Sequence, residues 1–231
     1  PEELEEEIEL LGADIYMYTS RDAIVISANT LTRNYSKTMQ LIEEILLQPR
    51  WDEEEFALIK TRTINDIKRR SAQPNYVARG VYNRLLYGEN HIYGYNTSGS
   101  AESVESIAID DIKDFYSANF SPSVSRFNVV GNISKKQVME SLKNLNNNWL
   151  PKDVTMPVYE LPTPVEKANL YFVDFPKAKQ SVIDIGYLAL ARTDKDYYPA
   201  TVMNYKLGGS FSGNVNLVLR EEKGFTYGAR S

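Results

Sequence analysis

A proline-rich segment constrains the fold of this chain more than any other feature of its sequence. Residues 151–164 contain four prolines and have neither helical nor strand periodicity. Because proline lacks a backbone N–H, neither a helix nor a central strand can run through this segment. We predict a first α+β subdomain at residues 1–150, an extended linker at 151–166 and the start of a second α+β subdomain at 167–231.

The ends of the chain suggest that more sequence surrounds it. The chain begins at Pro1 rather than Met, and it stops at Ser231 inside a predicted strand. We expect a piece of a longer protein, in which the first subdomain is truncated at its N-terminus and the second at its C-terminus.

Before the linker, the apolar spacing changes between helical and strand periods. Residues 1–11 have helical spacing and stop at Gly12, whereas residues 14–20 and 23–30 alternate across a short turn. This predicts a helix followed by an antiparallel hairpin. Further elements expected in this region are a helix from Asn34 or Ser36 to before Pro49, helices at 52–70, 74–87, 109–120 and 137–145, and a strand at 126–130.

After the linker, alternation predicts strands at 170–175, 181–189 and 225–229, and helical spacing predicts helices at 197–207 and 215–222. Strands and helices are interspersed, and neighbouring strands are joined by short turns. The predicted fold class is therefore α+β, with a largely antiparallel sheet packed with helices. No repeat of 20–50 residues is present, which argues against a solenoid.

The composition excludes several classes of function. The 231 residues include no Cys and one His, so disulfide scaffolds, thiolate zinc sites, cysteine nucleophiles and two-imidazole metal sites are excluded. The net charge of −5 argues against a nucleic-acid-binding face. No apolar run approaches the ~20 residues of a membrane span.

The tail of the chain contains the best candidate site. Arg220 falls in the last turn of a predicted helix, Gly224 is a natural helix stop, and Tyr227 lies on the strand that follows. A guanidinium and a phenol at this spacing can donate hydrogen bonds to one peptide carbonyl or oxyanion. On residue types alone we favour the structural alternative, in which Arg220 pairs with a nearby Glu and Tyr227 packs in the sheet.

Three other features have simpler interpretations. The glycine-rich loop 208–213 could hold a phosphate before a helix, but it lacks a Walker or dinucleotide pattern and reads as a tight connection. Asp66 is expected to pair with Arg62 or Arg70 on its helix rather than to bind a metal. His91 lies in a polar loop and is expected to be a loop residue rather than a ligand or base.

Taken together, the sequence resembles the insulinase/pitrilysin superfamily of zinc peptidases, and specifically its bacterial members similar to mitochondrial processing peptidase. The resemblance spans nearly the whole chain, over residues 2–31, 49–56, 86–94, 111–131, 180–186, 204–211 and 219–231. In that family two homologous α+β halves form a clam shell. One half carries H-x-x-E-H and zinc, and the other supplies an Arg and a Tyr that hold substrate.

The resemblance is to the half that lacks zinc, because H-x-x-E-H is absent from this sequence. It implies that Arg220 and Tyr227 bind the substrate backbone, that the chain has no catalytic or metal-binding residues, and that zinc belongs to the partner half. The implied function is chamber wall and carbonyl binding for an active half, on the same or a separate chain, that cleaves peptides. The implied compartment is the periplasm or the cytoplasm, with the periplasm favoured.

A second hypothesis is a structural or scaffolding homologue of the same fold, with no role in proteolysis. Arg220 and Tyr227 would then be packing residues. A third and weaker hypothesis is a phosphate-binding module that uses the loop 208–213. The chain alone is predicted to be inactive under each of these hypotheses.

Overall fold

The computed structural model describes residues 2–163 and 166–231. Pro1, at the start of the first predicted helix, and residues 164 and 165 of the predicted linker lie outside the described residues. Nothing in the structure tests the predicted subdomain boundaries at 151–166, and they stay a prediction.

The described residues form two compact units. The first unit runs to Thr163 and also includes Asn169–Asp184, and the second comprises residues 166–168 and Ile185–Ser231. Each unit is described by itself below. No helix within the described ranges is long and apolar enough to cross a membrane.

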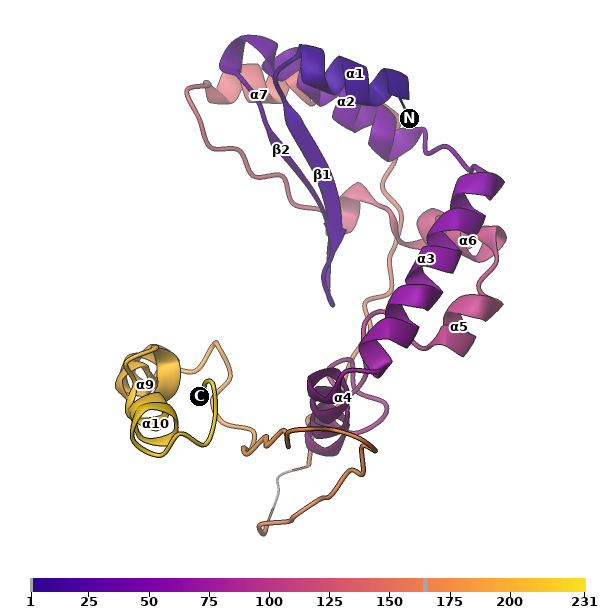
Figure 1. The fold of residues 1–231 in the computed structure, drawn as a ribbon. Helices are drawn as coiled ribbons and strands as arrows, with labels where there is room; N and C mark the ends of the chain where they lie inside the picture. Colours follow the sequence, from indigo (N-terminus) through magenta and orange to yellow (C-terminus); the bar gives the residue numbers. More distant parts are fainter. Residues whose placement is uncertain (1, 164–165) are drawn as a thin grey trace. The chain divides into compact units, whose positions relative to one another are not determined.

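Helices dominate the regular structure of both units (Figure 1). The first unit contains α1 (Glu2–Leu10), β1 (Asp14–Thr19), β2 (Ile24–Asn29), the 3-10 turn η1 (Thr32–Asn34), α2 (Tyr35–Leu47), α3 (Glu53–Ser71), α4 (Pro74–Tyr87), α5 (Ala101–Ser106), α6 (Ile109–Asn119), the 3-10 turn η2 (Pro122–Val124), α7 (Lys135–Ser141) and α8 (Lys143–Asn148). The second unit contains α9 (Tyr197–Asn204), the π-helical η3 (Tyr205–Gly209), the short α10 (Asn214–Asn216) and the π-helical η4 (Leu217–Glu222).

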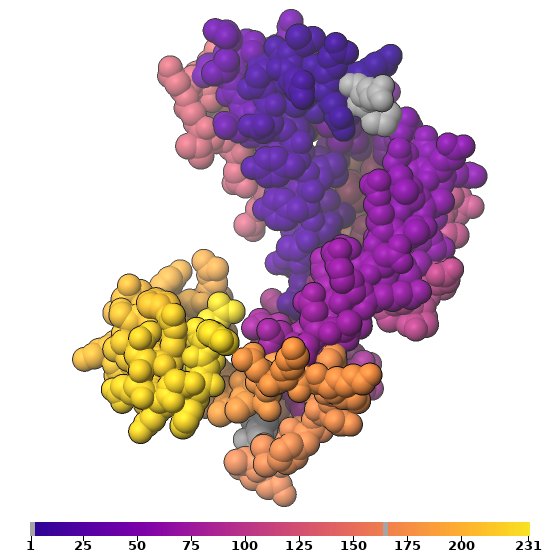
Figure 2. Space-filling view, in the orientation of Figure 1, coloured from indigo at the N-terminus to yellow at the C-terminus, as the bar shows by residue number. Residues whose placement is uncertain are grey.

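The hairpin of β1 and β2 confirms the prediction made from the alternating sequence. The two strands are antiparallel, and the register pairs Asp14 with Asn29. Ser20 closes the turn: its backbone N–H donates to the Ala23 carbonyl over 2.8 Å, and its hydroxyl donates to Asp22 Oδ1 over 2.7 Å. The hairpin packs against α1 (Figure 1), and its side chains form part of the surface seen in Figure 2.

The apolar core of the first unit is built around α2, where α1, α2 and α7 lie side by side (Figure 1). The Ser141 hydroxyl on α7 donates to the Tyr35 hydroxyl on α2 over 3.2 Å, which joins these two helices. The buried apolar side chains are Ala13, Met39, Leu41, Leu46, Ile67 and Val138. Burying a large side chain of this kind stabilises a fold by about 1.5–3 kcal/mol, so this small core is the main apolar contribution.

Local signals set the ends of several helices where the sequence predicted them. Asp52 caps α3, because its Oδ1 accepts the Glu55 N–H over 2.9 Å. This hydrogen bond holds the pKa of the Asp52 carboxyl below its ordinary value of 3.8. Pro74 opens α4, and Gly88, at a φ of 84°, ends it.

Hydrogen bonds from side chains connect distant parts of the first unit. The Tyr116 hydroxyl donates to the Leu46 carbonyl over 2.6 Å, and burial raises the pKa of this phenol. Ser121 is 1% exposed; its hydroxyl donates to the Lys152 carbonyl over 2.9 Å and accepts the Lys152 N–H over 3.0 Å. The second interaction attaches the start of the proline-rich segment to η2.

The α+β class is confirmed, but the sheet is smaller than expected. The segments predicted as strands at 126–130, 170–175, 181–189 and 225–229 are not strands in the structure. Alternating sequence favours an extended backbone, but a strand also requires a neighbouring edge to pair with, and within the described residues only β1 and β2 pair. The large apolar side chains of these segments are correspondingly exposed, as with Phe172 at 89% and Ile185 at 91%.

One helix prediction also needs correction, and one helix was not predicted. The helix expected at 137–145 is divided at Leu142 into α7 and α8. The loop expected at 89–100 is present, but it is followed by α5, which the sequence analysis missed. Ser100 caps α5 through the Ser103 N–H over 3.1 Å, a pattern with Ser at both positions that is less conspicuous than Ser with Glu.

Candidate functional site

Arg220 lies on η4 and stacks on an aromatic ring. Its guanidinium carbon is 4.7 Å from the centre of the Phe211 ring, a cation–π contact. Its Nη1 is 3.5 Å from Glu221 Oε1, and this nitrogen is shielded from solvent yet makes no hydrogen bond. The side chain as a whole is 35% exposed. The expected pairing with a nearby Glu is thus present, and one donor of the guanidinium has no acceptor.

Tyr227 follows the end of η4, where the chain turns at Gly224 with a φ of 63°. Its side chain is 86% exposed, so it does not pack in a sheet as the structural alternative expected. Tyr227 lines a cavity of about 520 Å³ that we call the tail cavity. The lining residues are Gly208, Gly209, Ser210, Phe211, Asn216, Tyr227, Gly228, Ala229, Arg230 and Ser231.

Phe211 relates the two predicted site residues to each other. Arg220 contacts its ring, and Tyr227 shares the tail cavity with it. Among the interactions of the described residues, none joins Arg220 directly to Tyr227. The structure therefore brings both residues to the surroundings of Phe211 without placing them in contact. The roles of Arg220 and Tyr227 in substrate binding stay a prediction.

Two asparagines that the sequence analysis missed fix the backbone around the tail cavity. Asn216 is 2% exposed; it donates to the Phe211 carbonyl over 2.7 Å and accepts the Ala229 N–H over 3.0 Å. Asn204 donates to the Ser231 carbonyl over 3.1 Å and accepts its hydroxyl over 2.7 Å. The available signal for Asn216 was an amide inside the apolar run 215–219 of a helix, where a buried polar group requires partners.

The glycine-rich loop 208–213 is part of the same assembly. The Gly208 carbonyl accepts the Ser231 N–H over 3.1 Å, and a Cβ on Gly208 would lie 2.8 Å from that nitrogen. A side chain at residue 208 would therefore displace the end of the chain. The loop is followed by α10, which has three residues and continues directly into the π-helical η4.

Asp66 is engaged by arginines of its own helix, α3. Its carboxylate lies 2.8 Å from Arg69 Nη2 and 3.9 Å from Arg70 Nη2. The expected pairing with Arg70 is present, and Arg69 rather than Arg62 is the second partner. This arrangement is a surface ion pair of a kind that contributes little to stability.

His91 belongs to a group of stacked rings that we call the ring cluster. Its imidazole lies 5.3 Å from Tyr87, 5.5 Å from Tyr93 and 5.4 Å from Tyr159, measured between ring centres. Its Nδ1 accepts the Tyr93 N–H over 3.1 Å, and the guanidinium of Arg21 lies over the Tyr93 ring at 4.9 Å. His91 thus packs among aromatic rings in its loop.

The described residues do not fit a zinc ion. A structural or catalytic zinc site needs three or four nitrogen, sulfur or carboxylate ligands at one point. Within residues 2–163 and 166–231, no group of three His, Asp or Glu residues is placed to hold a metal. His91 Nδ1 is already used as a hydrogen-bond acceptor.

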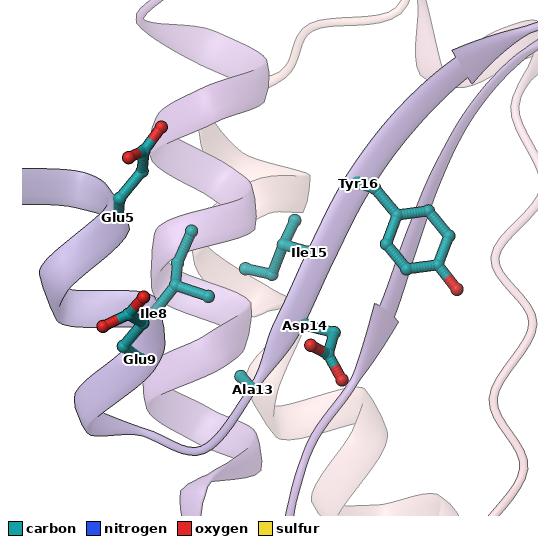
Figure 3. A pocket seen from close by; sticks show the side chains of 7 residues that line it. All are labelled: Glu5, Ile8, Glu9, Ala13, Asp14, Ile15 and Tyr16. Atoms are coloured by element: carbon teal, nitrogen blue, oxygen red, sulfur yellow. The ribbon is translucent and has the colours of Figure 1, made fainter. Parts of the chain in front are cut away.

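A second cavity lies between α1 and β1 in the first unit (Figure 3). It has a volume of about 270 Å³, and Ile8 and Ile15 face each other across it. The lining also includes three carboxylates, those of Glu5 and Glu9 on α1 and of Asp14 on β1. The cavity contains no cationic side chain and no His, and it does not resemble the tail cavity.

Comparisons with known proteins indicate what kind of domain this is. The sequence model described as the peptidase M16 inactive domain matches residues 106–231. An uncharacterized zinc protease of Bacillus subtilis, YmxG, is 23% identical over 99% of this chain and 54% of its own length. A non-peptidase homolog, also named YmxG, from Helicobacter pylori is 22% identical over 90% of this chain and 48% of its own length.

A solved structure agrees with these sequence matches. The crystal structure of a peptidase M16 inactive domain from Pseudomonas fluorescens has a TM-score of 0.77 with this chain at 23% identity, and the match covers 99% of this chain and 55% of that one. The fold is therefore shared. The chain spans about half the length of the relatives that it matches.

Proposed function

The chain belongs to the peptidase M16 family, and on this premise we propose that it is the non-catalytic half of a bacterial zinc-dependent peptidase. It matches the inactive domain of that family over residues 106–231. In this proposal a separate half, on the same or another polypeptide, carries H-x-x-E-H and zinc. This chain contributes part of the chamber wall and holds the peptide substrate.

The observation that carries the proposal is that Tyr227 and Phe211 line the tail cavity while the Arg220 guanidinium stacks on the Phe211 ring. The Arg220 side chain is 35% exposed, and Tyr227 is 86% exposed. Both groups donate hydrogen bonds, and a peptide carbonyl accepts two. Because the Phe211 ring holds the guanidinium at 4.7 Å, little ordering of this side chain is needed when a substrate binds.

The chemistry of the tail cavity suits an uncharged or acidic peptide segment. Arg230 is the one charged residue among those that line it, and Phe211 and Tyr227 supply aromatic surface. A peptide that presents a carbonyl to Arg220 can place a neighbouring side chain against these rings. Main-chain recognition of this kind tolerates different substrate sequences.

The proposal is tested in the complex with the zinc-bearing half. Arg220→Ala should lower kcat/KM for a peptide substrate by about 10²–10³-fold, the usual loss when a donor to a developing negative charge is removed. Tyr227→Phe removes one hydroxyl and should lower kcat/KM by about tenfold. Arg192→Ala and Tyr187→Phe are matched controls at exposed positions and should leave the rate unchanged.

The thermal unfolding midpoint of each variant should be measured beside its rate. A loss of activity in both site variants at an unchanged midpoint supports substrate binding. Equal rates for the site variants and their controls contradict a role of Arg220 and Tyr227 in substrate binding.

The isolated chain provides an independent test. It should bind no zinc stoichiometrically in a titration and should cleave no peptide. Tight zinc binding accompanied by turnover in the isolated chain contradicts the assignment to the non-catalytic half.

The second candidate is a structural homologue with no role in proteolysis. The similarity to a Helicobacter pylori protein described as a non-peptidase homolog favours it. In that case the chain would assemble with a partner that has no peptidase activity. Purification of the natural complex followed by a peptide-cleavage assay distinguishes the two candidates.

A further inference from the structure

Asn216 is the most completely buried polar side chain near the tail cavity. It is 2% exposed, and both ends of its amide are used. Its Nδ2 donates to the Phe211 carbonyl over 2.7 Å, and its Oδ1 accepts the Ala229 N–H over 3.0 Å. A buried amide with both ends satisfied resists displacement, since any movement leaves a polar group without a partner.

The two hydrogen bonds of Asn216 reach the two segments that carry the predicted site. Phe211 is the residue whose ring the Arg220 guanidinium contacts. Ala229 lies two residues after Tyr227 on the segment that follows Gly224. Asn216 itself ends α10, which continues directly into η4, the segment that carries Arg220. One amide therefore links the ring beneath Arg220, the helical turn before Arg220 and the segment that bears Tyr227.

Asparagine suits this position because one short side chain supplies both a donor and an acceptor. An aspartate at residue 216 would keep the acceptor for Ala229 but would present an ionised oxygen to the Phe211 carbonyl. A serine has one short hydroxyl in place of the two ends of the amide. An apolar residue would leave both backbone groups unpaired in a buried place.

We propose that Asn216 is a positioning residue that holds Arg220 and Tyr227 in the arrangement needed to grip a peptide. The inference deepens the proposed function and rests on it for its effect on activity. The two hydrogen bonds that join Phe211 and Ala229 to the Asn216 amide can be measured in the chain without any substrate.

The test compares Asn216→Asp with Asn214→Asp in the complex with the zinc-bearing half. Asn214 is exposed on the same short helix, α10, so it is a matched control for the added charge. Asn216→Asp should lower kcat/KM by at least about tenfold, and Asn214→Asp by less than about twofold. Asn216→Ser is the second variant, in case the aspartate prevents folding, and it should produce a loss in the same direction.

Two further readouts separate positioning from a general loss of stability. Amide hydrogen exchange of Ala229 should accelerate in Asn216→Ser, whose short hydroxyl does not replace the amide oxygen, while amides of α2 in the first unit keep their protection. Adding Asn216→Asp to the double variant Arg220→Ala/Tyr227→Phe should lower the rate by no more than about twofold, because the amide acts through these two side chains.

The outcomes separate this inference from the proposed function. If Arg220→Ala and Tyr227→Phe lower the rate but Asn216→Asp and Asn216→Ser do not, the positioning role is wrong and the proposed function stands. If the Arg220 and Tyr227 variants also leave the rate unchanged, both fail. Unchanged exchange at Ala229 in Asn216→Ser, or a further large loss when Asn216→Asp is added to Arg220→Ala/Tyr227→Phe, also overturns the positioning role.

Discussion

Every buried apolar side chain among the described residues belongs to the first unit, and most of them lie on or around α2. In the second unit the buried residues are Gly208, Gly213 and Asn216, and none of them contributes a large apolar side chain. The first unit is thus organised by apolar packing and the second by hydrogen bonds from two asparagines and close approach of glycines. Packing energy grows with buried area, whereas hydrogen bonds fix geometry. The two units should therefore respond to different kinds of substitution.

The largest difference should come from truncating one large apolar side chain in each unit, a buried one in the first and an exposed one in the second. Leu41→Ala, at a residue 7% exposed, should reduce the free energy of unfolding by about 2–5 kcal/mol. Ile185→Ala, at a residue 91% exposed in the second unit, should change it by less than about 0.5 kcal/mol. Urea unfolding measures both, and equal losses at the two positions would break the comparison.

A buried polar group of the first unit should have an intermediate effect. Ser121→Ala leaves the Lys152 N–H without its acceptor, while the Lys152 carbonyl keeps the Ser123 hydroxyl, and we expect a loss of about 1–3 kcal/mol. Ser106→Ala removes an exposed hydroxyl that bonds within α5 and serves as the control. If both variants unfold at the same urea concentration, hydrogen bonds matter no more in the buried part of the first unit than at its surface.

Asn204 offers a smaller and more local effect in the second unit. Asn204→Ala removes two hydrogen bonds to Ser231 at an exposed place. The free energy of global unfolding should change by less than about 0.5 kcal/mol, while hydrogen exchange of the Ser231 amide accelerates. The Leu41 amide, measured in the same experiment, should stay protected. An earlier global unfolding transition in this variant contradicts the independence of the apolar core from these bonds.

The smallest effect concerns pH and the cap of α3. The pKa of Asp52 is held below its ordinary value, so its charge stabilises the fold above that value and ceases to do so as the pH falls through the lowered pKa. Asp52→Asn keeps a capping oxygen but has no titrating group. The difference in unfolding midpoint between the natural chain and Asp52→Asn should therefore be larger at neutral pH than in acid. Asp114→Asn, an exposed residue on α6, is the control.

Several signals confined to a few neighbouring residues were read correctly from the sequence, although the equally local cap of α5 at Ser100 was missed. The cap at Asp52, the stop at Gly88 and the hairpin turn at Ser20 each depend on contacts within three residues. The predicted strands 170–175 and 181–189 depend on a distant pairing edge, which alternation alone does not supply. For that reason the pairing of these segments could not be inferred from the sequence.

The candidate site also has features that the sequence predicted and features that it did not. Arg220 and Tyr227 were identified through resemblance to a family, and the structure adds that both border Phe211. The bonds of Asn216 to Phe211 and Ala229 span five and thirteen residues, and they could not be inferred from spacing. The way the loop 208–213 folds back onto the following helix determines which backbone groups the buried Asn216 amide can bond.

The ring cluster also gives the protein an internal reporter. Since His91 is the sole histidine, its two imidazole carbon-bound protons give proton resonances that need no isotopic labelling or mutagenesis to assign. Circulating electrons in the three tyrosine rings around it displace those resonances from their positions in an unstructured peptide. A one-dimensional spectrum can therefore follow whether this loop keeps its stacked arrangement when a peptide or another polypeptide is added.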